Sequence, residues 1–279
     1  MTVTQRIADV QQPRGGYIKP SAFKATTLND GIILGEENVS GIIIGLAVDY
    51  LTRFMMGADL RDAFRISLKV AHAAQELELV SFNAEEVAEH LLDDIKGLDQ
   101  RSIISACKLV SFDSWYRNPI SALLGTDYSC IDPNSSTIEN IKTFVKRSIT
   151  FFEEYGPVIS DGFNFKPEKL DPSAFEKMNE TGTGSYGGYT PTVSAGDGDF
   201  LTNDTLWDFK VSKSKPTSKH TLQLLMYWIM GQHSGQKIFK GITRLGIFNP
   251  RLNIVYLYDV KDIPDEVIEA VEKDVICYD

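Results

Sequence analysis

The sequence has little cysteine and no long apolar run. Its three cysteines, Cys107, Cys130 and Cys277, are far apart and form no CxxC pair, so this chain alone cannot build a zinc ribbon or a four-cysteine iron–sulfur cluster. The longest apolar run, at 41–48, is far shorter than the roughly 20 residues of a membrane helix, and no basic-then-apolar signal pattern follows Met1. We therefore expect a soluble, cytoplasmic protein with reduced thiols and no membrane partner.

Motifs of several common enzyme classes are also missing. His72, His90 and His233 form no metal-binding cluster, and the chain has no GxSxG nucleophile motif. The glycines at 182, 184 and 187 match the dinucleotide fingerprint in spacing, but an extended segment at 190–193 follows them where a helix is needed. Residues 231–237 lack the spacing of a phosphate loop. The function must therefore depend on other residues.

Acidic residues are absent from one long segment, although they predominate overall. The chain has 28 Lys and Arg against 38 Asp and Glu, a net charge of −10, which by itself argues against a polyanionic partner. Residues 209–258 contain no Asp or Glu and carry Lys210, Lys213, Lys215, Lys219, Lys237, Lys240, Arg244 and Arg251. This segment predicts a confined phosphate-binding surface, although charge alone fits a solvated basic face equally well.

The apolar pattern changes its period along the chain. Apolar residues at three- and four-residue spacing predict helices near 37–56, 60–78, 84–97, 99–110 and 136–155, after an extended N-terminal arm. Residues 160–188 are expected to be irregular. Strands are then expected at 190–201, 206–211, 238–248 and 253–260, with helices at 218–230 and 264–273. This order indicates an α+β fold.

Two aspartates are expected to face each other across a hairpin. If Asn203 and Asp204 form its two-residue turn, Asp199 lies directly opposite Asp208, with Cβ atoms about 5 Å apart. Two carboxylates at that distance repel unless a cation lies between them, and oxygen ligands favour a hard ion such as Mg²⁺ or Mn²⁺. Lys210 follows on the same strand face, and this set suits metal-assisted phosphodiester hydrolysis.

These residues, in this order, resemble a known family. Gly196 with Asp199, then Asp208 with Lys210, then Gln223 four residues before Tyr227, is similar to the motif series of the PD-(D/E)xK nuclease superfamily, most closely its RecB-like exonuclease branch. The motif-bearing match covers about 190–230. The resemblance implies a restriction-endonuclease-like central mixed sheet flanked by helices. On this basis we expect 1–160 to be an N-terminal arm and helical region packing on a nuclease core and closing helix at 161–279, or one continuous domain.

The resemblance also implies roles for individual residues. Asp199, Asp208 and the backbone carbonyl of Phe209 would bind Mg²⁺ or Mn²⁺, and Lys210 would orient the attacking water. Gln223 and Tyr227 share one helix face and would point toward the site or the bound strand. The residues expected to contact nucleic acid around the start of this helix are Lys213, Lys215, Lys219 and His220.

Two positions depart from the family pattern. The family usually has a glycine followed four residues later by a metal-binding histidine, and here Gly45 is followed by Asp49. Asp49 can bind Mg²⁺, but it can equally pair with Arg53 one turn on. The leading Pro-Asp of the family is also absent, because Gly198 precedes Asp199.

The sequence therefore predicts a metal-dependent nuclease that acts on nucleic acid, with DNA favoured because the resembling branch mostly acts on DNA. The main alternative keeps the fold without the chemistry, as a decayed module that binds nucleic acid or a protein partner. A solvent-facing hairpin in which Lys210 neutralises Asp208 or Asp197 is a structural alternative. An Asp-x-Asp sugar-transferase site at 197–199 is disfavoured because no βαβ alternation precedes it.

Overall fold

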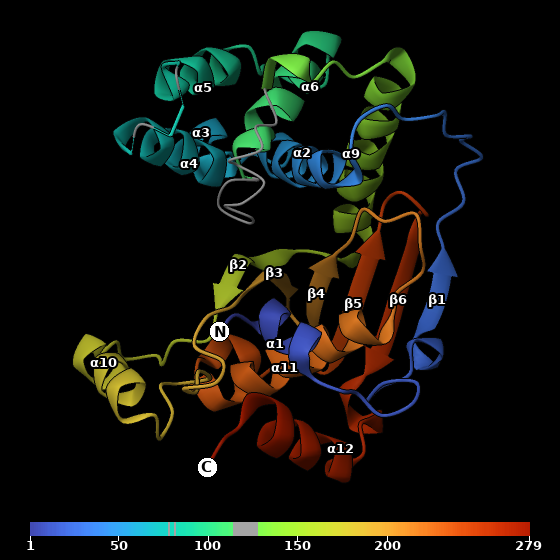
Figure 1. The fold of residues 1–279 in the computed structure, drawn as a ribbon. Helices are drawn as coiled ribbons and strands as arrows, with labels where there is room; N and C mark the ends of the chain where they lie inside the picture. Colours follow the sequence, from blue (N-terminus) through green and yellow to red (C-terminus); the bar gives the residue numbers. More distant parts are fainter. Residues whose placement is uncertain (78, 81, 114–127) are drawn as a thin grey trace. The chain divides into compact units, whose positions relative to one another are not determined.

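A computed structural model describes residues 1–77, 79–80, 82–113 and 128–279 (Figure 1). The chain forms two units, the first comprising Met1–Leu28 and Glu154–Asp279 and the second comprising Asn29–Glu153. The sequence placed the boundary at residue 160, whereas by contacts the N-terminal arm and residues 154–160 belong with the C-terminal part. The pattern of polar and apolar residues does not show that residues 1–28 pack with residues 154–279, because the two segments are far apart in the sequence.

The first unit is built on a six-stranded mixed sheet, which confirms the expected α+β class. The strands run in the order β1-β6-β5-β4-β3-β2, and only β4 and β5 are parallel neighbours. Their bounds are β1 Lys24–Thr27, β2 Val158–Asn164, β3 Asp197–Thr202, β4 Thr205–Phe209, β5 Arg244–Asn249 and β6 Ile254–Asp259. Helix α11, Ser218–Ser234, connects the two parallel strands, as a parallel connection requires.

One face of the sheet packs on α11. Leu201 and Leu206, which pair across β3 and β4, join the buried cluster that includes the α11 residues Leu222 and Met226. Helix α11 is buried on nearly all sides because α1, Val3–Asp9, and the π-helical turn at Val271–Ile276 also contact it. Helix α11 is therefore held in a fixed position relative to the ends of β3 and β4.

The other face of the β3–β4 hairpin is covered by aromatic rings. Phe200 pairs with Trp207, and their rings stack with centroids 6.1 Å apart, while Tyr155 meets Trp207 edge-on at 5.6 Å. The indole Nε1–H of Trp207 donates to Thr202 Oγ1 at 3.1 Å. Trp207 is completely buried, so this hairpin is anchored from both faces.

The second unit consists of the expected helices. They are α2 Gly41–Met55, α3 Leu60–Ala63, α4 Arg65–Glu76, α5 Ala84–Asp93, α6 Gln100–Leu109 and α9 Ser135–Tyr155, the last ending in the first unit. Ser40, Asn83 and Asp99 cap α2, α5 and α6 by accepting backbone N–H groups. These caps and the apolar spacing explain why the helices were predictable.

Five sequence expectations about secondary structure are wrong in part. The strand expected at 238–248 begins only at Arg244, after a 3-10 turn at Lys237–Phe239, and the helix expected at 60–78 is divided into α3 and α4. The segment 160–188 is not irregular throughout, since it contains most of β2 and the helix α10, Pro172–Thr181, capped by Asp171. Residues 190–196 form no regular strand, so β3 begins only at Asp197. The N-terminal arm contains α1, which has a capping box at Thr2. The closing helix is observed as α12, Asp265–Ala270, followed by the π-helical turn.

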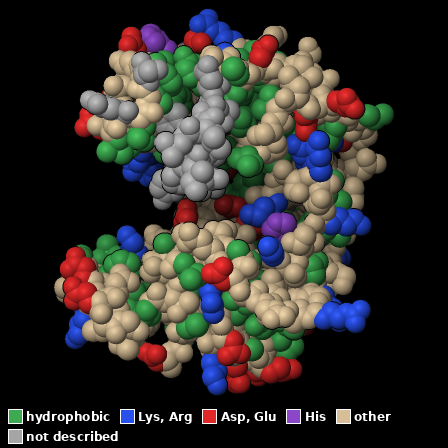
Figure 2. All heavy atoms as spheres, viewed as in Figure 1, with side chains coloured by type: hydrophobic (Ala, Val, Ile, Leu, Met, Phe, Trp, Pro, Cys, Tyr) green, Lys and Arg blue, Asp and Glu red, His purple; other side chains and the backbone are tan. Residues whose placement is uncertain are grey.

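The described part of the chain contains no helix with both the length and the apolar character needed to cross a membrane. Figure 2 shows acidic, basic and apolar side chains interspersed over the visible surfaces of α10 and α12. A broad apolar patch does not occur on these two helices in this view.

The close approach of β5 to Trp207 yields a test of the sheet packing. Gly246 pairs with Trp207, and a Cβ atom added at Gly246 would lie 2.3 Å from the buried indole ring. We expect Gly246→Ala to lower the free energy of unfolding by about 1–3 kcal/mol, because the ring must move to admit a methyl group. Gly97→Ala is the matched control, since its Cβ would meet nothing within 4 Å. Urea denaturation checks this, and equal stability of both variants would contradict the packing.

Candidate active site

The two aspartates lie opposite each other, as the hairpin register predicted. Phe200 pairs with Trp207 and Leu201 with Leu206, so the same register sets Asp199 against Asp208. Asp199 Oδ2 accepts the backbone N–H of Phe209 at 2.6 Å, which fixes this carboxylate against the end of β4. The chain leaves β4 at this end and enters α11, so the acid pair and the start of α11 lie at the same edge of the sheet.

Asp208 is a buried carboxyl group with an incomplete set of partners. Its side chain is 1% exposed, and Oδ1 lies 2.8 Å from Lys210 Nζ, whose side chain is 30% exposed. Oδ2 is buried and has no hydrogen-bond partner. Burial raises the pKa of Asp208 to about 7, with a further increase from Asp199 and an opposing effect of Lys210. The ion pair expected for a solvent-facing hairpin is present, but the aspartate does not face solvent.

Gln223 and Tyr227 form a buried pair on α11, and Tyr227 lies close enough to the two aspartates to feel their charge. Gln223 Nε2 donates to the Tyr227 hydroxyl oxygen at 2.8 Å, and both side chains are buried. Burial raises the pKa of Tyr227 above its usual range, and the nearby carboxylates, with Asp208 contributing most among them, raise it further. Asp199, Asp208 and Lys210 therefore lie together at the end of the hairpin, Tyr227 lies within range of their charges, and Gln223 is joined to the group through its hydrogen bond to Tyr227.

The residues predicted to bind nucleic acid surround the start of α11. Lys213, Lys215 and Lys219 are exposed, on the connection from β4 and on the first turn of the helix. His220 Nδ1 accepts the backbone N–H of Thr217 at 3.0 Å, which assigns the ring proton of the neutral imidazole to Nε2. Burial lowers the pKa of His220, and Lys210 lowers it further, so the neutral form is favoured beside the ammonium group.

An aromatic support under the site was not visible in the sequence. A Cβ atom at Gly198 would lie 1.9 Å from the ring of Phe163, which pairs with Gly198 from β2. The ring of Phe163 in turn meets Tyr227 edge-on at 5.9 Å. Any side chain before Asp199 would therefore require this ring to move. The alternation of Phe163 and Phe165 was the available signal, but the glycines around it favoured a loop.

The acid pair fits a divalent cation at one atom in particular. Within the described residues no group of three or more His, Cys, Asp and Glu side chains could hold a metal ion. The candidate ligands stay those predicted from the sequence, which are Asp199, Asp208 and the Phe209 carbonyl. The partnerless Asp208 Oδ2 is a buried anionic oxygen of the kind that Mg²⁺ and Mn²⁺ bind. Water molecules ordinarily complete the shell of such ions.

The remaining metal candidate, Asp49, lies on α2 in the second unit. Its Oδ1 accepts from Arg53 Nε at 2.9 Å, one helical turn on, as the non-catalytic interpretation expects. The role of Asp49 as a metal ligand stays a prediction.

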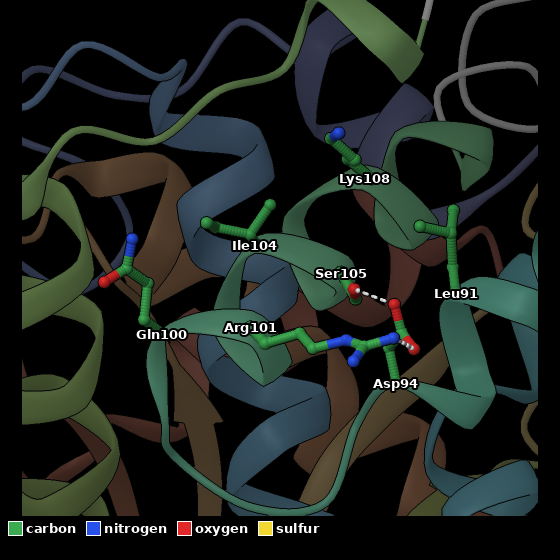
Figure 3. Close-up of a pocket in the computed structure, with 7 residues that line it drawn as sticks. All are labelled: Leu91, Asp94, Gln100, Arg101, Ile104, Ser105 and Lys108. Atoms are coloured by element: carbon green, nitrogen blue, oxygen red, sulfur yellow. Dashed lines mark hydrogen bonds and ion pairs between the residues drawn. The ribbon is translucent and has the colours of Figure 1, made fainter.

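A separate cavity of about 420 Å³ lies between α5 and α6 in the second unit (Figure 3). Arg101 pairs there with Asp94 at 2.5 Å, and Ser105 donates to the same carboxylate at 3.4 Å. Its other lining residues are Leu91, Gln100, Ile104 and Lys108. None of the predicted site residues lines it.

Comparison with known protein families, with characterised proteins and with solved structures found no match to this chain.

The burial of Asp208 predicts a pH-dependent cost in the metal-free protein. The pKa of Asp208 is raised from 3.8 to about 7 in the folded protein. Ionisation of Asp208 therefore does not lower the stability of the fold below about pH 4, and it lowers that stability by its full amount above about pH 7. In a chelating buffer we expect Asp208→Asn to be more stable than the unchanged protein at pH 8, by on the order of 1–4 kcal/mol, and to gain less at pH 5.

Thermal unfolding at both pH values measures this difference. Glu180→Gln, at an exposed position on α10, is the control and should change stability equally at both. A gain for Asp208→Asn that is no larger at pH 8 than at pH 5 would show that the carboxylate is not buried as described.

Proposed function

We propose that this protein is a metal-dependent nuclease that hydrolyses phosphodiester bonds of nucleic acid, with DNA as the favoured substrate. The observation that supports this most strongly is the partnerless buried oxygen of Asp208, within an opposed acid pair beside Lys210. The ordered resemblance to RecB-like PD-(D/E)xK nucleases supports it as well. That resemblance implies a mixed sheet flanked by helices, with the acids on a hairpin and the Gln–Tyr pair on the next helix.

Each residue of the site has a chemical task in this proposal. A bound Mg²⁺ or Mn²⁺ would supply activation of water and neutralisation of charge on the scissile phosphate. Asp199 and Asp208 provide the anionic oxygens that hold it. Lys210, anchored on Asp208 with one face open to solvent, donates hydrogen bonds to the attacking water and to developing negative charge.

Gln223 and Tyr227 position groups around the acid pair. Tyr227 accepts from the Gln223 amide, so its own O–H remains available to donate toward the carboxylates or a bound strand. Its raised pKa keeps that proton in place at neutral pH. We infer that this pair orients the site and takes no proton from the substrate. The three cysteines are free, as expected for the cytoplasmic location that we also propose.

One observation favours a second candidate function. Asp49, at the position where the resembling family has a metal-binding histidine, forms an ion pair with Arg53. A nuclease-fold module that binds nucleic acid or a protein partner without cutting it is therefore the alternative. Such a module has no reason to retain a buried Asp208 opposite a second carboxylate, because this arrangement costs stability without a cation.

Substitution of the lysine tests the proposed chemistry. We expect the protein to cleave DNA in Mg²⁺ or Mn²⁺ and Lys210→Ala to slow cleavage by about 10²–10³-fold, because the donor to the developing charge is lost. EDTA should abolish cleavage. Linear and circular, single- and double-stranded substrates separate exonuclease from endonuclease action in the same gel assay.

Lys169→Ala is the control, because Lys169 is exposed and lies in the same unit. This variant should cleave DNA at the normal rate. Equal rates for Lys210→Ala and Lys169→Ala would remove Lys210 from the mechanism. Folded protein that binds DNA and cuts none of the substrates would favour the binding module.

A further inference from the structure

A second segment without acidic residues lies near the N-terminus. Between Asp9 and Asp30 the chain has no Asp or Glu and carries Arg14, Lys19 and Lys24. The part of the N-terminal arm that carries these cations is residues 10–28, which follow α1. Together with 209–258 it makes two segments with eleven cations and no carboxylate, in a chain whose net charge is −10.

The structure packs the N-terminal arm against the first turn of α11. The arm turns at 13–16, where the Gly16 N–H donates to the Pro13 carbonyl at 2.8 Å. Gly16 has φ +90°, and a Cβ atom there would lie 2.6 Å from Ser218 Cβ. Both the positive φ and the close approach to Ser218 favour glycine at position 16. The turn therefore lies directly beside Ser218, the residue that precedes Lys219.

Two further contacts hold the arm in this place. Thr221 Oγ1 donates to the Ile18 carbonyl oxygen at 2.7 Å, and Ile18 is buried. The methylene groups of Lys19 lie over Gly15, since a Cβ there would meet Lys19 Cγ at 3.5 Å. Lys19 therefore extends over the turn that touches α11.

The arm then continues as the edge strand β1, paired with β6, with Lys24 exposed at its start (Figure 1). The two acid-free segments thus lie side by side at β1–β6 and again at α11.

The cations where the arm meets α11 are not neutralised by neighbouring acids. Arg14, Lys19, Lys215 and Lys219 are exposed, and within the described chain no carboxylate lies at ion-pair distance from any of them. Elsewhere in 209–258 such pairs do occur, as between Lys237 and Glu168 and between Arg244 and Asp204. Four uncompensated cations on adjoining segments form a surface suited to successive phosphates.

We propose that the N-terminal arm is part of the nucleic-acid-binding surface, with Arg14 and Lys19 contacting backbone phosphates beside those held by Lys215 and Lys219. This rests on the proposed nuclease function and adds the place where the strand runs. Ser218 precedes Gln223 by five residues, about 7.5 Å along the helix, or about two nucleotide steps of a duplex. A strand whose scissile phosphate lies at the acid pair therefore reaches the arm within a few nucleotides.

The test measures DNA binding without cleavage. A fluorescein-labelled 20-base-pair duplex is titrated with the full chain in EDTA, at several salt concentrations, by fluorescence anisotropy. The double variant Arg14→Ala/Lys19→Ala should bind about tenfold or more weakly at 0.1 M salt. The slope of log K against log salt should become shallower by about 1.8, because two phosphate contacts are lost.

The control is Lys169→Ala/Lys177→Ala, which removes two exposed lysines of the same unit and should keep the full slope. The proposal would be overturned if Arg14→Ala/Lys19→Ala had the same DNA affinity and the same salt slope as this control. It would also be overturned if the unchanged protein did not bind the duplex.

Cleavage in Mn²⁺, assayed separately, distinguishes the two proposals. DNA binding that depends on the arm, without any cleavage, supports this surface and counts against the nuclease. Cleavage by a protein whose DNA affinity is unchanged in the arm variant supports the nuclease and counts against this surface.

Discussion

The arrangement of the first unit depends on one buried charge. Asp208 is almost completely inaccessible to water, has Lys210 on one oxygen and nothing on the other, and faces the carboxylate of Asp199 across the hairpin. Such a group costs several kcal/mol to bury as an anion unless a cation completes its partners. Its pKa of about 7 expresses that cost. A structural role does not require two carboxylates here, whereas binding a hard cation does.

The surrounding fold keeps the acid pair from relaxing. Trp207 and Phe200 fix one face of the hairpin, and α11 covers the other, so the strand cannot turn Asp208 out to solvent. Gly198 lets the tip of the Phe163 ring approach the strand beside Asp199, and this ring also contacts Tyr227 edge-on. Rigid neighbours on every side suit a site whose ligand supplies the missing charge.

Much of this could be predicted from the sequence, and the rest could not for physical reasons. The hairpin register followed from a two-residue turn at Asn203 and Asp204, and the helical spacing of Gln223 and Tyr227 put both on one face. The burial of Asp208 could not be predicted from the hairpin sequence alone, because the helix α11 that packs on this face lies outside the hairpin. The strand β2 was missed since Gly162 and polar residues interrupt its alternation. The packing of the N-terminal arm on α11 depends on the approach of Gly16 to Ser218 and on the hydrogen bond from Thr221 to Ile18. These contacts span about two hundred residues of sequence and leave no periodic signal.

The most direct measurement is a calorimetric titration of the metal-free protein with Mn²⁺ alone, in the absence of nucleic acid. We expect saturable binding that is lost in the double variant Asp199→Asn/Asp208→Asn. The single variant Asp49→Asn should retain it, because the essential ligands lie on the hairpin. Binding that is unchanged in the double variant, or absent from the folded unchanged protein, would contradict the assignment of the acid pair as a cation site.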